Sequence, residues 1–148
     1  MKIYLDNCWL QRPLDDKSQL RIQLEAEAIL AVLTFCERQE VQLVSSDVLM
    51  FETDKNPHPQ RKAYVEEILT NAPIFVELNP QIIQRGKELE AVGFKGADAL
   101  HLACAEAEEV DYFCSCDEKL IRRAKTLKVV RIKVVLPLGS VDISSGAK

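Results

Sequence analysis

Short apolar runs alternate along the chain with longer segments whose apolar residues recur every three or four positions. The short runs are rich in β-branched and aromatic residues and predict strands at 2–5, 41–46, 74–78, 111–115 and 129–135. The longer segments predict helices at 19–38, 47–54, 60–69, 80–92, 97–108 and 117–127. Strands that alternate with helices indicate an α/β fold of three layers, in which helices flank a central, mainly parallel sheet.

Polar residues and prolines mark where the predicted elements begin and end. Ser46 can cap the helix that begins at Asp47, and Phe51 is expected on the apolar side of that helix. Residues 56–59 (NPHP) end it, because proline lacks an N–H group and restricts the residue before it. The chain shows no internal repeat and no linker, so one domain is expected over residues 1–137, with a short C-terminal tail at 138–148.

Composition narrows the class of protein. The chain has 148 residues, of which 47% are hydrophobic and 28% are charged, as is typical of one soluble globular domain. No apolar stretch is long enough for a membrane span, and the N-terminus lacks the apolar run of a signal peptide. The five cysteines include no CxxC pair, and Cys114 and Cys116 are expected to be buried thiols rather than zinc ligands. These features favour a cytoplasmic protein.

The charge is unevenly distributed. The net charge of −4 argues against a generally basic nucleic-acid binder. Residues 118–148, however, carry eight Lys or Arg and two acids, so this end has a charge of +6 and the remainder −10. An acidic body with a basic end could hold a metal in one place and phosphates in another. The simpler alternative is a solvated helix face followed by a strand with a basic edge.

Four acids occupy matching positions around the predicted strands. Asp6 follows the first strand, Glu52 lies in the helix after the second, Asp98 begins the helix before the fourth, and Asp117 follows the fourth. Functional groups of a parallel sheet gather at the carboxyl ends of its strands. Taken singly, an acid at a helix start stabilises the positive end of the helix dipole. Asp47 lies near the same flank as Glu52 and is its rival.

Several carboxylates at one place would repel one another unless a cation lay between them. Mg²⁺ or Mn²⁺ prefers oxygen ligands, keeps several waters and needs only a few carboxylates. The chemistry that uses such a site is phosphoryl transfer. His101 is expected to pack or form hydrogen bonds near the site, and His58, between two prolines, is expected to be exposed.

Four segments of the sequence resemble the PIN-domain ribonucleases, especially the VapC-like toxins of type II toxin–antitoxin systems. The segments are IYLDN, VSSDVLMFE, GADALHLACA and DYFCSCDEKLIRRA. The resemblance implies a PIN-like fold and the catalytic acids Asp6, Glu52, Asp98 and Asp117. It implies that Asp6, Asp98 and Asp117 bind the metal, and that Asn7 and Ser115 support the site, Ser115 through a hydroxyl hydrogen bond to Asp117. The segment CWLQRPLDD departs from the family pattern, and a loop across the mouth of the site is expected there.

The expected function is therefore a Mg²⁺- or Mn²⁺-dependent endoribonuclease that cleaves RNA phosphodiester bonds, with RNA backbone contacts from Arg122, Arg123 and Lys125. The resemblance also implies a small cognate antitoxin and a homodimer. Two alternatives remain: a catalytically silent PIN-like interaction module, and a housekeeping nuclease with no antitoxin. A receiver domain and an aspartyl-nucleophile phosphatase are disfavoured, because the acid at position 6 is followed by Asn7 and Cys8 rather than by a second acid.

Overall fold

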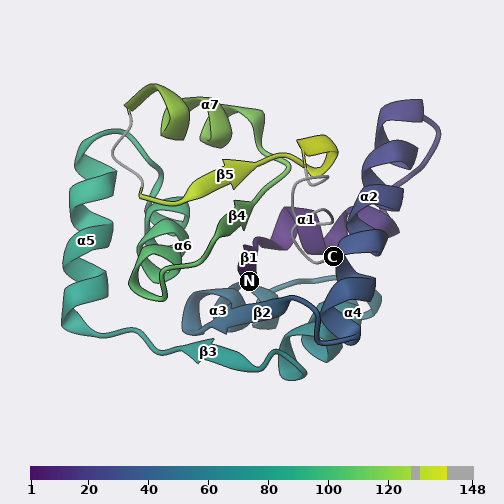
Figure 1. Ribbon diagram of the computed structural model, residues 1–148, viewed down its shortest axis with the longest axis horizontal. Helices are drawn as coiled ribbons and strands as arrows, with labels where there is room; N and C mark the ends of the chain where they lie inside the picture. Colours follow the sequence, from purple (N-terminus) through teal and green to yellow (C-terminus); the bar gives the residue numbers. More distant parts are fainter. Residues whose placement is uncertain (128–130, 140–148) are drawn as a thin grey trace.

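Five parallel strands form the centre of the computed structural model, which describes residues 1–127 and 131–139 (Figure 1). Their order across the sheet is β3-β2-β1-β4-β5, and every neighbouring pair is parallel. The strands are β1 (Lys2–Leu5), β2 (Gln42–Ser46), β3 (Ile74–Val76), β4 (Tyr112–Cys114) and β5 (Lys133–Val135). The predicted α/β fold with a central parallel sheet is confirmed.

Seven α-helices and two short 3₁₀ segments among the described residues connect and cover the strands. Figure 1 shows α5 and α6 on one side of the sheet and α1 and α2 on the other. The helical elements are α1 (Asn7–Gln11), η1 (Arg12–Leu14), α2 (Leu20–Glu37), α3 (Asp47–Asp54), α4 (Pro59–Thr70), α5 (Pro80–Ala91), α6 (Gly96–Ala107), α7 (Glu118–Leu127) and η2 (Pro137–Gly139). None of the described helices is long and apolar enough to cross a membrane.

The sequence of β1 is almost wholly apolar because this strand lies at the centre of the sheet. It pairs with β2 on one side and β4 on the other, so that Tyr4 lies opposite Val44 and Phe113. Ile3, Tyr4 and Leu5 are fully buried. A strand covered on both faces has no solvent side, and its side chains need not alternate between apolar and polar.

One side chain predicted to face the core does not. Phe51 is 59% exposed. On α3 the buried residues include Leu49 and Thr53, one turn apart, and a residue midway between them points to the opposite side. Phe51 instead lies under the ammonium group of Lys55, whose nitrogen is 4.1 Å from the ring centroid.

The prediction of a loop after Asn7 is wrong, because the segment forms α1 and η1. The carboxylate of Asp6 accepts the N–H of Trp9 at 3.0 Å and so caps α1. Trp9 and Leu10 are fully buried, and this burial fixes the helix against the core. Pro13 does not break α1, because it falls in the short 3₁₀ turn η1 that follows.

Predictions at the C-terminal end are tested only in part. Of the predicted strand at 129–135, residues 133–135 form β5, while residues 129 and 130 lie outside the described residues. The predicted tail at 138–148 also lies mostly outside them, since only residues 138 and 139 are described. Among the cysteines, Cys114 and Cys116 are buried free thiols, as predicted.

Candidate functional site

The sheet brings the starts of several helices to its carboxyl edge. Asp6 follows β1 directly, and α3 follows β2 directly. The far end of α6 is fixed at the opposite edge, because Glu108, just after α6, forms an ion pair with Lys2 at the start of β1 (3.2 Å). The start of α6, with Asp98 in its first turn, therefore points toward the carboxyl edge.

Asp6 is a buried carboxylate, 8% exposed, between β1 and α1. Its Oδ1 accepts the N–H of Trp9 and the thiol of Cys8, both at 3.0 Å. Burial raises the pKa of Asp6 well above its ordinary value, and the neighbouring Cys8 raises it further. The Ser115 hydroxyl and the Trp9 N–H oppose this rise in pKa only in part. A cation beside Asp6 would favour its charged form.

Asp98 is affected by the charges of its neighbours. Asp98 is half-buried; burial raises its pKa, and the negative charges of Asp117 and Glu52 raise it further, whereas His101 and Lys95 lower it. Because charges act strongly only over short distances in solvent, these effects indicate that Asp117 and Glu52 each lie in the neighbourhood of Asp98.

Asp117 begins α7 as a capping residue. Its Oδ1 accepts the N–H groups of Lys119 (2.9 Å) and Leu120 (3.2 Å). Its own N–H donates to the buried hydroxyl of Ser115 at 3.0 Å. Ser115 thus holds the backbone of Asp117 in place, and the second carboxylate oxygen of Asp117 accepts no hydrogen bond from the part of the chain that the structure describes.

Glu52 lies next to Asn7 and His101. Its Oε1 accepts the side-chain N–H of Asn7 at 3.1 Å and a short hydrogen bond from His101 Nε2. Burial raises the pKa of Glu52, but His101 and Asn7 lower it by a larger amount, so the net shift is downward. Glu52 is therefore held as a carboxylate beside the residue that follows Asp6.

The rivals of Glu52 on α3 point elsewhere. Asp47 Oδ2 accepts the N–H of Leu78 at 2.7 Å, beyond the end of β3. Asp54 is exposed and pairs with Lys62 of α4 at 3.4 Å. Of the three acids on α3, Glu52 is the one in contact with Asn7.

The acids share an edge but do not form a closed metal site. Within residues 1–127 and 131–139, no three His, Cys, Asp or Glu side chains are grouped so that they could hold a metal ion. The donor set nevertheless suits a hard cation, because it consists of carboxylate oxygens. Asp6, Asp98 and Asp117 are the residues that would hold Mg²⁺ or Mn²⁺.

Basic side chains gather on α7, close to Asp117 in sequence. Arg122, Arg123 and Lys125 are all exposed. Arg122 and Arg123 line a shallow hollow of about 400 Å³ together with Lys119, Thr126 and Leu127. Arg123 also lies against the turn after α5, since a Cβ added at Gly93 would come within 2.5 Å of its guanidinium nitrogen. Arg122 is therefore freer than Arg123 to contact a ligand.

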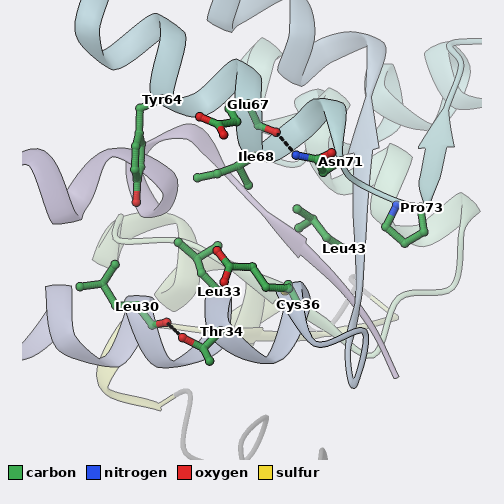
Figure 2. A pocket seen from close by; sticks show the side chains of 11 residues that line it. Leu30, Leu33, Thr34, Cys36, Leu43, Tyr64, Glu67, Ile68, Asn71 and Pro73 are labelled. Atoms are coloured by element: carbon green, nitrogen blue, oxygen red, sulfur yellow. Dashed lines mark hydrogen bonds between the residues drawn. The ribbon is translucent and has the colours of Figure 1, made fainter.

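One cavity of the described residues is separate from the acids. It has a volume of about 340 Å³ and lies between α2 and α4, as Figure 2 shows. Its lining includes apolar and polar side chains, and none of the four acids contributes to it. The lining residues are Leu30, Leu33, Thr34, Cys36, Glu37, Leu43, Tyr64, Glu67, Ile68, Asn71 and Pro73.

The sequence analysis missed Tyr4 as a member of the site. Its hydroxyl contacts His101 Nδ1 at 2.5 Å and Ser46 Oγ at 2.7 Å. Burial raises the pKa of Tyr4 most, and the charges of Cys104, Glu52 and Asp6 raise it further. The one available signal was a phenol inside a strand that is otherwise apolar, since a buried hydroxyl needs a partner.

Comparison with known proteins gives a likeness in structure alone. No family model matches the sequence, and no curated protein matches it. A chain of the VapBC-1 structure from nontypeable Haemophilus influenzae matches with a TM-score of 0.60 and 13% identity, over 93% of this chain and 99% of that chain. A chain of VapBC2 from Rickettsia felis, bound to a DNA fragment from their promoter, matches with a TM-score of 0.58 and 12% identity, over 92% and 98%.

These two likenesses extend over nearly the whole of each matched chain, with no large part left over on either side. At 12–13% identity they concern the path of the chain and not its chemistry. The chain therefore has the α/β fold of the VapBC structures, the PIN-like fold that the resemblance of its sequence segments predicted.

Proposed function

We propose that the chain is a metal-dependent endoribonuclease that hydrolyses RNA phosphodiester bonds, and that it acts as the toxin of a toxin–antitoxin pair. The observation that carries the proposal is the placement of Asp98, whose pKa is raised by burial and by the charges of Asp117 and Glu52, with buried Asp6 at the same edge of the sheet. Such a group of carboxylates costs stability unless it serves a cation. The likeness to VapBC structures supports a nuclease toxin over other uses of the same acids.

The four acids have two kinds of role in the proposed site. Asp6, Asp98 and Asp117 hold one or two Mg²⁺ or Mn²⁺ ions, and Glu52 assists directly or through water. A bound cation of this kind polarises a phosphate and lowers the pKa of a bound water. Asp6 and Asp117 each use Oδ1 to cap a helix, so their carboxylates are already oriented by α1 and α7.

Arg122 and its neighbours on α7 bind the RNA backbone in this proposal. They lie on the helix that Asp117 caps, so phosphate contacts there would align the substrate with the acids. Contacts of this kind carry no base specificity and weaken as salt is added.

Nuclease assays on matched variants test the proposal. Asp6→Asn and Asp98→Asn should keep their fold and lose Mn²⁺-dependent RNA cleavage by at least about a hundredfold, the scale on which removing one electrostatic group from an active site acts. Asp54→Asn is the control, because Asp54 is an exposed acid on the same helix as Glu52. The Asp54→Asn protein should cleave RNA as the unaltered protein does. Cleavage that survives both first variants, or that proceeds equally in excess chelator, would contradict the mechanism.

A catalytically silent interaction module is the second candidate. It is favoured by the lack of a closed group of three metal ligands among the described residues. Mn²⁺ binding separates the two: the module predicts no binding that depends on Asp6, and the nuclease predicts binding that Asp6→Asn abolishes.

The proposed partners are a small cognate antitoxin and a second copy of the chain. Expression of the protein alone should arrest growth, and expression together with a short neighbouring reading frame should restore it. A housekeeping nuclease would cleave RNA with the same acids yet cause no arrest.

A further inference from the structure

A chain of hydrogen bonds runs through the core and ends at Glu52. Ser46 Oγ and Tyr4 Oη are 2.7 Å apart, and Tyr4 Oη is 2.5 Å from His101 Nδ1. His101 Nε2 then makes a short hydrogen bond to Glu52 Oε1. The four residues come from β2, β1, α6 and α3, so these hydrogen bonds join β1 and α6 to the consecutive elements β2 and α3.

The first three members of this chain have little freedom to move. Tyr4 and Ser46 are fully buried and His101 is 3% exposed. The Tyr4 ring stacks on Phe113 with centroids 5.4 Å apart and meets the His101 ring edge-on at 5.6 Å. Ser46 Oγ also caps α3 by accepting the N–H of Leu49 at 3.1 Å. Packing therefore fixes the imidazole before it reaches Glu52.

Both donors that reach Glu52 bind the same oxygen. A carboxylate can only accept, so His101 Nε2 and Asn7 Nδ2 each donate a hydrogen to Oε1. The other oxygen, Oε2, accepts no hydrogen bond from residues 1–127 and 131–139. The Glu52 side chain is 35% exposed, in contrast to the buried residues behind it. The arrangement saturates one oxygen and leaves the second available.

We propose that Ser46, Tyr4 and His101 are positioning residues that hold Oε1 of Glu52, so that Oε2 is the oxygen presented to a divalent cation or to its bound water. The inference rests on the proposed function and deepens it, because it assigns a role to residues that need not touch metal or RNA. Partners of this kind orient a metal-binding carboxylate and raise its affinity for the ion.

A purely structural role of Ser46, Tyr4 and His101 can be distinguished from a positioning role by whether the effects of mutating them depend on Glu52. If the hydrogen bonds of Ser46, Tyr4 and His101 only satisfied buried polar groups, their loss would lower the stability of the protein whether or not Glu52 were present. If these hydrogen bonds position Glu52, their loss should weaken cation binding only while Glu52 is present. A double-mutant cycle separates the two cases.

Mn²⁺ titrations followed by electron paramagnetic resonance supply the main test. Tyr4→Phe removes only the hydroxyl and keeps the stacked ring, and His101→Leu removes the donor to Glu52. Each should weaken Mn²⁺ binding by roughly tenfold, the lower end of the effect of losing such a partner. His101→Gln keeps an N–H donor and should recover most of the affinity. In a Glu52→Ala background all three changes should have no further effect on Mn²⁺ affinity.

An imidazole ¹⁵N spectrum gives a second readout that needs no metal. The chain has two histidines, and His58→Gln assigns their signals. Tyr4→Phe should shift the ring nitrogens of His101 and leave those of exposed His58 unchanged. His58→Gln should also bind Mn²⁺ as the unaltered protein does.

Two results of the Mn²⁺ titrations would overturn the inference while leaving the proposed function intact. One is Mn²⁺ binding that depends on Asp6 but is unchanged by Tyr4→Phe and His101→Leu. The other is an equal loss of affinity with and without Glu52. If Asp6→Asn leaves Mn²⁺ binding unchanged, the metal site itself is wrong and the positioning role is overturned with it. Unshifted His101 nitrogens in Tyr4→Phe would show that the hydrogen-bonded chain does not form.

Discussion

At the scale of single residues, Asp98 shows a conflict between stability and function. A carboxylate in the first turn of a helix is favoured by the helix dipole. Asp98 is nevertheless half-buried and faces the charges of Asp117 and Glu52, so its pKa is raised. The unfavourable effects exceed the favourable one, and the residue destabilises the cation-free protein in its charged form.

Asp98→Asn should therefore stabilise the protein in the absence of divalent cations. Removing one charge from the group should raise the melting temperature by about 2–4 °C, the shift that about 1 kcal/mol produces in a domain of this size. Asp16→Asn, at an exposed acid in the loop before α2, is the control and should change little. Thermal unfolding in chelator measures both, and a lower melting temperature for Asp98→Asn would contradict the repulsion.

The stabilisation by Asp98→Asn should depend on pH in a defined direction. The folded protein raises the pKa of Asp98 above its ordinary value of 3.8, so the folded state holds this proton more tightly than the unfolded chain does. The destabilisation is thus fully present above the raised pKa and disappears as the pH falls below 3.8. The difference in unfolding free energy between the Asp98→Asn protein and the unaltered protein should therefore shrink as the pH falls from the raised pKa of Asp98 to below 3.8. A difference that grew over this range would contradict a raised pKa of Asp98.

Ser115 is a second residue whose effect can be isolated. Its buried hydroxyl accepts the N–H of Asp117, which begins the turn into α7. Ser115→Ala should leave that N–H without its partner and lower the unfolding free energy by about 1–2 kcal/mol. Ser115→Thr retains the hydroxyl and serves as the control in chemical denaturation. Equal stability of the alanine variant would mean that water replaces the hydroxyl.

At the scale of elements, the alternation of apolar runs and helical periods was enough to predict the strands, the long helices and hence the parallel sheet. The same logic placed the four acids at one edge, since β1, β2 and β4 all end there. Short α1 was missed because the segment after Asn7 was expected to form a loop, although Asp6 was available as the cap of a helix. What a sequence pattern omits is the exact rotation of each helix about its axis.

That rotation decides which side chains meet. Periodicity put Phe51 in the core, yet α3 turns its Leu49 face inward and Phe51 outward. The contact of Tyr4 with His101 joins positions 97 apart in the chain. It depends on the sideways placement of α6 over β1, which no local pattern encodes. Local patterns therefore singled out the candidate acids near strand ends and in helices, but not the hydrogen-bonded residues behind them.

The turn between α5 and α6 offers a test at the level of elements. Gly93 has φ +111°, a left-handed conformation that side chains rarely adopt, and a Cβ there would come within 2.5 Å of an Arg123 nitrogen. Gly93→Ala should lower the unfolding free energy by more than about 1 kcal/mol. Gly96→Ala is the matched control, because its Cβ would meet only the mobile carboxylate of Glu90. Comparable losses in both variants would show that the turn is not specifically strained.

At the scale of the whole molecule, acidic and basic groups occupy adjoining regions. Asp117 caps the helix whose exposed side carries Arg122, so the proposed cleavage site and the proposed phosphate contacts share one element. The net charge of −4 conceals this arrangement. The overall negative charge would keep RNA away from other surfaces, and α7 would give the backbone a defined place to bind.

The salt dependence of RNA binding tests this division. Arg122→Gln should weaken binding of single-stranded RNA of any sequence and reduce the slope of log affinity against log salt by about 0.7, the value for one lost phosphate contact. Arg38→Gln, at an exposed position just after α2, should leave the slope unchanged. Measurements in Ca²⁺ or with Asp6→Asn would prevent cleavage during the titration. If Arg122→Gln keeps the full slope while an arginine elsewhere reduces it, the RNA path does not cross α7, and the acids must be approached from another side of the sheet edge.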